Sequence, residues 1–201
     1  MPIAINGSGT ITGVSVGGLP DGIVDTDMIA AGAVTAAKRG AGAILQVAST
    51  TKTDVYSEQF STISEGGGIT GFTVAITPSS SSNKVLLTGF MSVGTSGTSE
   101  HCLGYRIYRG STLISIGDTA GNRGRVTGSS NFGNGGNRAP DNVVINHLDS
   151  PSTTSSVTYS IRFYHQYATG TTLYLNRGGN GDNNNGRTRA TSTITAMEVA
   201  A

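Results

Sequence analysis

After residue 44, apolar side chains recur at every second position in short runs, which are separated by residues that favour turns. The run of Val157, Tyr159, Ile161 and Phe163 shows this alternation most clearly. Successive side chains of a β-strand point to opposite faces, so an alternating run is typical of a strand with one buried face. No helix of three turns fits after residue 45, which excludes parallel βαβ units.

Together these runs predict an all-β fold, an antiparallel β-sandwich that is jelly-roll-like. The predicted strands cover residues 44–48, 72–76, 84–93, 103–109, 113–116, 143–147, 157–163, 173–175 and 194–199. We interpret Glu65 and the three glycines that follow it as a flexible hairpin loop, because no Lys-Ser/Thr pair or helix follows to complete a phosphate-binding loop.

The first 43 residues differ from the rest of the chain because they are rich in Gly and Ala and hold few bulky side chains. They permit a short helix capped by Asp25 or Asp27, yet they cannot bury a core of their own. We expect an attachment or oligomerisation arm over 1–43, followed by a β-sandwich domain over 44–201. The arm is then either disordered or ordered by other chains. Its candidate anchors are Ile11, Val14, Leu19, Met28, Ile29 and Val34.

The composition excludes several classes of protein. Charged residues make up only 12% of the chain and the formal net charge is +1, so no strong field favours nucleic acid. No apolar run is long enough to cross a membrane as a helix, and we expect no secretory signal at the N-terminus. The single cysteine, Cys102, rules out a disulfide framework within the chain.

The residues that usually carry catalysis are sparse and scattered. The spacing of His101, His147 and His165 matches no metal-binding motif, and Cys102 precedes an apolar strand, so it is expected to be a buried, inert thiol. His147 and His165 continue strand alternations, which predicts that both face the interior. We therefore predict no catalytic residue, no metal and no cofactor.

Two polar loops, 119–142 and 176–189, are the candidate recognition surfaces because they present Arg and Asn on glycine-rich backbone. They serve either as solvated connectors or as contacts to a neighbouring subunit or a host-surface glycan. Asp182 offers too few carboxylates for calcium. The candidate residues are Arg123, Arg125, Asn134, Arg138, Asp182, Asn183, Arg187 and Arg189.

The sequence GSGTITGVSVGGLPDGIVDTDMIAAGAVTAAKRGAGAILQV resembles a segment common in structural proteins of tailed phages, especially those of marine bacteria and cyanobacteria. AITPSSSSNKVLL, YRIYRGSTLISIGD and the terminal STITAMEVAA resemble later parts of the same family. The resemblance implies a trimeric appendage protein with an N-terminal attachment region and a C-terminal β-domain.

The expected function is therefore that of a non-enzymatic virion protein, a short tail fibre or spike that attaches to the host surface. The alternative is a capsid decoration or cement protein of the same fold, and a tailspike glycan depolymerase is a third possibility. The expected partners are further copies in a homotrimer, other tail or capsid proteins and a host-surface glycan, without nucleic acid or membrane insertion. The protein is expected in the virion, after synthesis in the host cytoplasm.

Overall fold

The computed structural model describes residues 38–96, 102–131, 139–166, 170–179 and 185–201, together with 4–5, 11–12, 29, 31 and 33–35. The chain divides into two units, Met1–Arg39 and Gly40–Ala201. In the first unit, β1 (Ala4–Ile5) pairs with β2 (Ile11–Thr12) in antiparallel fashion.

The described side chains of the arm are exposed. Ile29 and Val34 lie in bends, and the described positions around them are turn or irregular rather than helical. The backbone of Ile11 belongs to β2, whereas Val14, Leu19 and Met28 lie outside the described residues. The rest of the segment in which a short helix was expected also lies outside them.

The described residues of the second unit form eleven strands. They are β3 (Ile44–Lys52), β4 (Tyr56–Phe60), β5 (Ser64–Ile76), β6 (Lys84–Thr95), β7 (Cys102–Arg109), β8 (Thr112–Ser115), β9 (Gly128–Asn131), β10 (Asp141–Asp149), β11 (Val157–His165), β12 (Thr171–Leu175) and β13 (Ser192–Val199).

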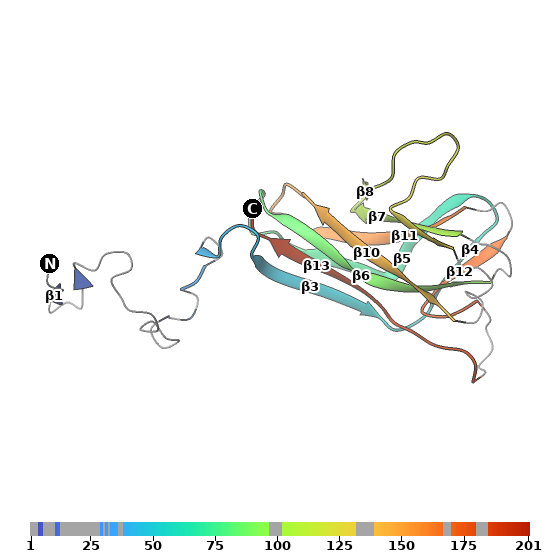
Figure 1. Ribbon diagram of the computed structural model, residues 1–201, viewed down its shortest axis with the longest axis horizontal. Coiled ribbons are helices and arrows are strands. Elements are labelled where there is room, and N and C mark those ends of the chain that lie inside the picture. Colours follow the sequence, from blue (N-terminus) through green and yellow to red (C-terminus); the bar gives the residue numbers. More distant parts are fainter. Residues whose placement is uncertain are drawn as a thin grey trace. The chain divides into compact units, whose positions relative to one another are not determined.

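These strands form two antiparallel sheets that face each other (Figure 1). One sheet places β3, β13, β6 and β10 side by side, and the other places β5, β11, β7 and β8 side by side. Strands from the two ends of the chain are therefore neighbours, which is the double Greek-key order of a jelly roll. β12 and β4 extend the first sheet, and β9 pairs with β7 in the second. The predicted fold class is confirmed.

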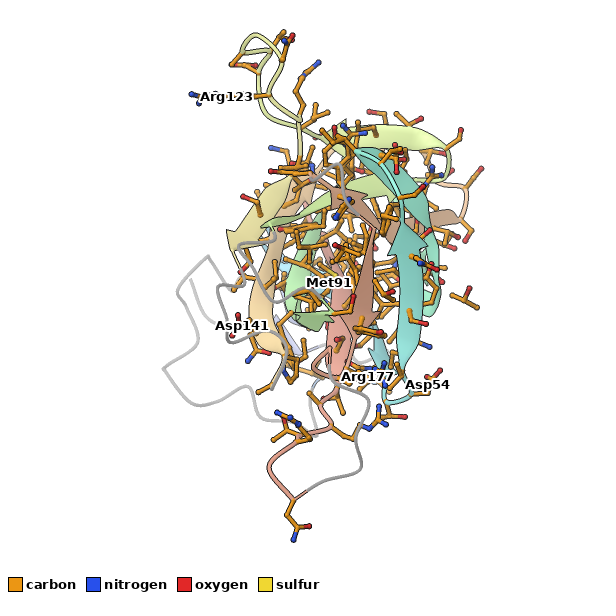
Figure 2. The ribbon with its side chains drawn as sticks, turned by 90° about the vertical axis from the view of Figure 1, so that its right-hand side faces the viewer. Asp54, Met91, Arg123, Asp141 and Arg177 are labelled. Atoms are coloured by element: carbon orange, nitrogen blue, oxygen red, sulfur yellow. The ribbon has the colours of Figure 1, made fainter. Side chains whose placement is uncertain are left out.

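The core lies between the two sheets. Alternate residues of β11 and β7 face it, and Ile161, Phe163 and Ile107 are fully buried there. Val85, Leu87 and Met91 approach them from β6, as Figure 2 shows for Met91. The prediction that Ile161 and Phe163 point into the sandwich is confirmed.

The segment expected to be a hairpin loop is instead part of a strand. Glu65 and Gly66–Gly68 belong to β5, where Gly68 pairs with Arg162 and Glu65 pairs with Tyr164 across irregular register shifts. The loop prediction is therefore wrong. Gly66 lacks a Cβ, so the Glu58 carboxylate occupies that space, and Gly67 N donates a 2.8 Å hydrogen bond to Glu58 Oε1. The glycines admit a side chain from the neighbouring sheet rather than forming a turn.

Two of the three histidines can be placed. His165 is fully buried, stacks on Phe60 and has Nδ1 3.2 Å from the carbonyl oxygen of Thr62. His147 lies on the inward-facing side of β10 but is only partly buried. His101 and the side chain of Cys102 lie outside the described residues. No group of three or more potential metal ligands occurs within the described ranges, and no described helix is long and apolar enough to cross a membrane.

Candidate functional site

The outward-facing side of the sheet formed by β10, β6, β13 and β3 carries apolar side chains in register. One row across the four strands consists of Leu148, Leu86, Met197 and Val47. Val144 and Phe90 form a second apolar pair four positions along. Leu148 is 48% exposed, Val47 59% and Val144 66%, although all three lie within regular strands. We call the side chains of these six residues the outer apolar face.

The side chains between the two apolar rows are neutral. Between the two apolar rows lies a row of Asn146, Thr88, Thr195 and Ser49, in which the hydroxyls of Ser49 and Thr195 are 2.9 Å apart. Four strands about 4.8 Å apart and seven residues long span on the order of 400 Å². Apolar patches of a few hundred Å² on a folded protein are often functional.

The two ends of the jelly roll differ in which parts of the chain they contain. At one end the chain from the arm enters the domain, where Gly42 N donates to Ala200 O at 2.8 Å and Ala200 N donates to Ala43 O at 2.9 Å. β3 then runs its full length to Lys52 at the other end. Nine residues of strand cover roughly 30 Å, so the second end lies far from the point of entry.

The second end is organised by Asn176, a fully buried residue with a positive φ of 68°. Its side-chain amide donates 2.8 Å hydrogen bonds to the carbonyl oxygens of Lys52 and Asp54, and its Oδ1 accepts one from Ser192 Oγ at 2.6 Å. Asn tolerates this left-handed conformation better than most residues. The network fixes the backbone from which the 176–189 loop starts.

Arg177 directly follows Asn176, and Arg187 and Arg189 lie in the segment that returns from the 176–189 loop. Arg177 forms an isolated antiparallel bridge with Arg189, and Arg187 precedes Arg189 by two residues. The Arg177 guanidinium lies over the Tyr174 ring, 3.9 Å from its centroid. Within the part of the chain that the structure describes, no acidic side chain forms an ion pair with any of the three. We call Arg177, Arg187 and Arg189 the arginine cluster.

The other predicted loop is tethered to the outside of the second sheet. Arg106 Nε donates to Arg125 O at 2.8 Å, and Arg125 Nε donates to Gly117 O at 2.7 Å. Gly124 lies directly against the Tyr164 ring, where a Cβ would clash. Arg125 therefore holds the loop on the sheet, while Arg123 is exposed at its tip.

A charged cluster supports that tether. The Glu65 carboxylate accepts hydrogen bonds from Arg106 at 2.6 Å, Arg162 at 3.0 Å and Tyr108 at 2.8 Å. Burial raises the pKa of the Glu65 carboxyl, but these hydrogen bonds outweigh burial and hold it below its ordinary value. Burial and the bond to Glu65 raise the pKa of the Tyr108 hydroxyl.

The predicted recognition residues that the structure describes thus lie in two separate places and not in one site. Figure 2 shows Arg123 and Arg177 on opposite sides of the molecule. Arg187 and Arg189 meet in the arginine cluster, whereas Asn134, Arg138, Asp182 and Asn183 lie outside the described residues. Sequence reasoning missed Arg177 as a site residue and missed the outer apolar face. The alternation in residues 84–93 and 143–147 predicts two of the strands. Only the pairing of β6 with β10 shows which of their exposed residues are neighbours.

Comparisons with known proteins give matches only among solved structures. No family model and no curated protein matches the chain. A structure of infectious bursal disease virus, Gx strain, matches 78% of the chain at 18% identity with a TM-score of 0.35. A mutant VP2 protein of the same virus in T=1 particles matches 78% at 16% identity with a TM-score of 0.37. The chain spans 37% and 36% of the lengths of those two chains. The jelly-roll assignment rests on the strand order of this chain itself.

Proposed function

We propose that this chain is a non-enzymatic virion structural protein, a short tail fibre or spike of a tailed phage. The arm attaches it to the particle, and the jelly roll faces the host surface. The resemblance of its sequence to phage structural proteins supports the assignment. Jelly rolls are also frequent in virus particles and lectins, which supports it by analogy of fold alone.

The observation that carries the proposal is the outer apolar face. Exposed Leu, Val and Phe side chains in register on a regular sheet are costly in water unless another surface covers them. The occupant that we propose is further copies of this chain around a three-fold axis, with this face of each copy turned toward the axis. Neutral side chains suit this arrangement, because identical charges would repel where copies of one face meet.

Light scattering on the purified chain tests this assembly. We expect about three chain masses at micromolar concentration, and a variant with Val47→Glu and Leu148→Glu should be monomeric because each copy would add two charges to the contact. Ile63→Glu is the matched control, since Ile63 is 56% exposed but lies outside the outer apolar face. A wild-type chain that stays monomeric contradicts the assembly.

The alternative role is that of a capsid decoration or cement protein, in which the same arm clamps the shell. The two roles differ in copy number per virion, tens for a fibre against hundreds for decoration. Quantitative mass spectrometry of purified particles separates them.

The proposal that the chain is not an enzyme is supported by what its buried carboxylates do. Asp149 accepts hydrogen bonds from Arg109 at 2.8 Å and from Tyr159 at 2.7 Å, and Glu198 accepts them from Asn83 and Gln46 at 2.6 Å. Both are occupied within the fold, whereas glycan hydrolysis needs two carboxylates facing a substrate groove. Release of reducing ends from host polysaccharide would contradict a non-enzymatic role.

A further inference from the structure

The arginine cluster places like charges where a sheet normally avoids them. Arg177 and Arg189 lie directly opposite each other in an antiparallel bridge, so their side chains leave the same face. Opposed like charges are destabilising unless a counter-charge lies between them. Lys52 nearby is paired with Asp54 at 2.6 Å, and within the described ranges no ion pair offsets the charge of the three arginines.

The guanidinium groups also have unused hydrogen-bonding capacity. The Nε atoms of Arg177 and Arg187 are buried and have no hydrogen-bond partner among the described residues. A buried donor without an acceptor is costly, and an oxyanion bound by the same guanidinium groups would offset their charge. The planar guanidinium matches the two oxygens of a carboxylate or phosphate.

The cluster stands on rigid structure. Besides its side-chain bonds, Asn176 N donates to Ser92 O at 2.6 Å, and Asn176 O accepts from Ala190 N at 3.1 Å. The Tyr174 ring supports the Arg177 guanidinium from below. The Arg177 guanidinium and the backbone at Arg189 are therefore held in place before any ligand arrives, which lowers the entropic cost of binding.

We propose that Arg177, Arg187 and Arg189 form a binding site for the carboxylate or phosphate groups of an acidic host-surface polysaccharide. The choice of a polysaccharide rests on the proposed function, in which the arm faces the particle. The cluster lies at the Lys52 end of β3, opposite to the end where Gly42 and Ala43 enter the jelly roll.

Binding of defined polymers to the full-length chain tests the site. The probes are polygalacturonate for carboxylates, a phosphomannan for phosphates, neutral dextran as the uncharged control and poly-glutamate as an acidic peptide. We expect wild-type protein to bind one or both acidic polysaccharides, more weakly at higher salt, and not to bind dextran. No binding of either acidic polysaccharide, or tighter binding of poly-glutamate, overturns the proposal.

Variants locate the site on the protein. Arg177→Gln with Arg189→Gln should weaken binding at least about tenfold, and Arg177→Lys with Arg189→Lys should weaken it less because the charge remains. Lys84→Gln is the control, because Lys84 is an exposed cation that pairs with Val199 at the end where the chain enters the jelly roll. Unchanged binding by the Gln double variant at an unchanged melting temperature overturns the site. Light scattering on the same samples shows separately whether the proposed assembly holds.

Discussion

Single residues differ widely in how much of the stability they carry. Phe163 is fully buried and its ring centroid lies 6.0 Å from that of Tyr56. Phe163→Ala should lower the free energy of unfolding by about 3–5 kcal/mol, since it leaves a cavity between the sheets. Ile63→Ala, at a site 56% exposed and outside the outer apolar face, should change it by less than about 0.5 kcal/mol. Chemical denaturation measures both, and a loss below about 1 kcal/mol for Phe163→Ala contradicts the core assignment.

Buried carboxylates make stability depend on pH. Glu198 is only 1% exposed, and burial alone raises the pKa of its carboxyl. Hydrogen bonds from Asn83, Gln46 and Ser79 lower it further than burial raises it, so the folded pKa lies below the ordinary value of 4.5. A depressed carboxyl pKa stabilises the folded state above the unfolded pKa, and this contribution disappears as pH falls through the folded pKa.

The free energy of unfolding should therefore decline as pH falls below the ordinary glutamate range. Glu198→Gln should be less stable at pH 7 and should lose less stability on acidification, because the titrating group is gone. Denaturant midpoints between about pH 7 and pH 3 measure this. Parallel declines for wild type and variant contradict the assignment, since the slope would then come from other groups such as Glu65.

At the scale of elements, alternation predicted the strands that bury one face. It did not find β4, where YSEQF carries only Tyr and Phe as apolar residues, or β9, whose sequence GSSN reads as a turn. In both cases pairing with a neighbouring strand holds the segment in extended conformation, because β4 pairs with β12 and β9 pairs with β7. Short polar segments become strands when the sheet beside them offers unpaired backbone groups.

Strand packing also makes glycine necessary at position 89. Gly89 lies in β6 with φ 155°, and a Cβ there would clash with the carbonyl oxygen of Thr193 in β13. Gly89→Ala should lower the free energy of unfolding by about 2–4 kcal/mol, because backbone of the neighbouring strand must move. Gly68→Ala is the matched control, since an added Cβ there meets nothing within 4 Å. Equal denaturation midpoints for the two variants contradict this account.

For the whole molecule, the sequence pattern predicts where strands lie but not which strands pair with one another. The sequence places Arg177 twelve positions before Arg189, and only the bridge makes them neighbours. The outer apolar face likewise combines residues from four strands that are distant along the chain. Local periodicity contains no information on which strands pair. The sequence therefore predicts the loops 119–142 and 176–189 but not where they lie relative to each other.

The boundary between arm and jelly roll leads to a last prediction about attachment. The sequence suggested a boundary after residue 43, whereas Gly42 and Ala43 hydrogen-bond to Ala200 as part of the second unit. Deleting residues 1–39 should therefore leave the melting temperature of the jelly roll unchanged and abolish incorporation into particles. Deleting 1–43 should also cost about 1–2 kcal/mol, because two backbone hydrogen bonds are lost.

Calorimetry and mass spectrometry of purified particles measure the two effects independently. The longer deletion serves as the control for stability, since both variants lack the proposed anchor but only one disturbs the jelly roll. If the protein without residues 1–39 enters particles at the wild-type copy number, attachment resides in the jelly roll itself. The outer apolar face would then be the surface to test against the particle, because Val47, Val144 and Leu148 are exposed there.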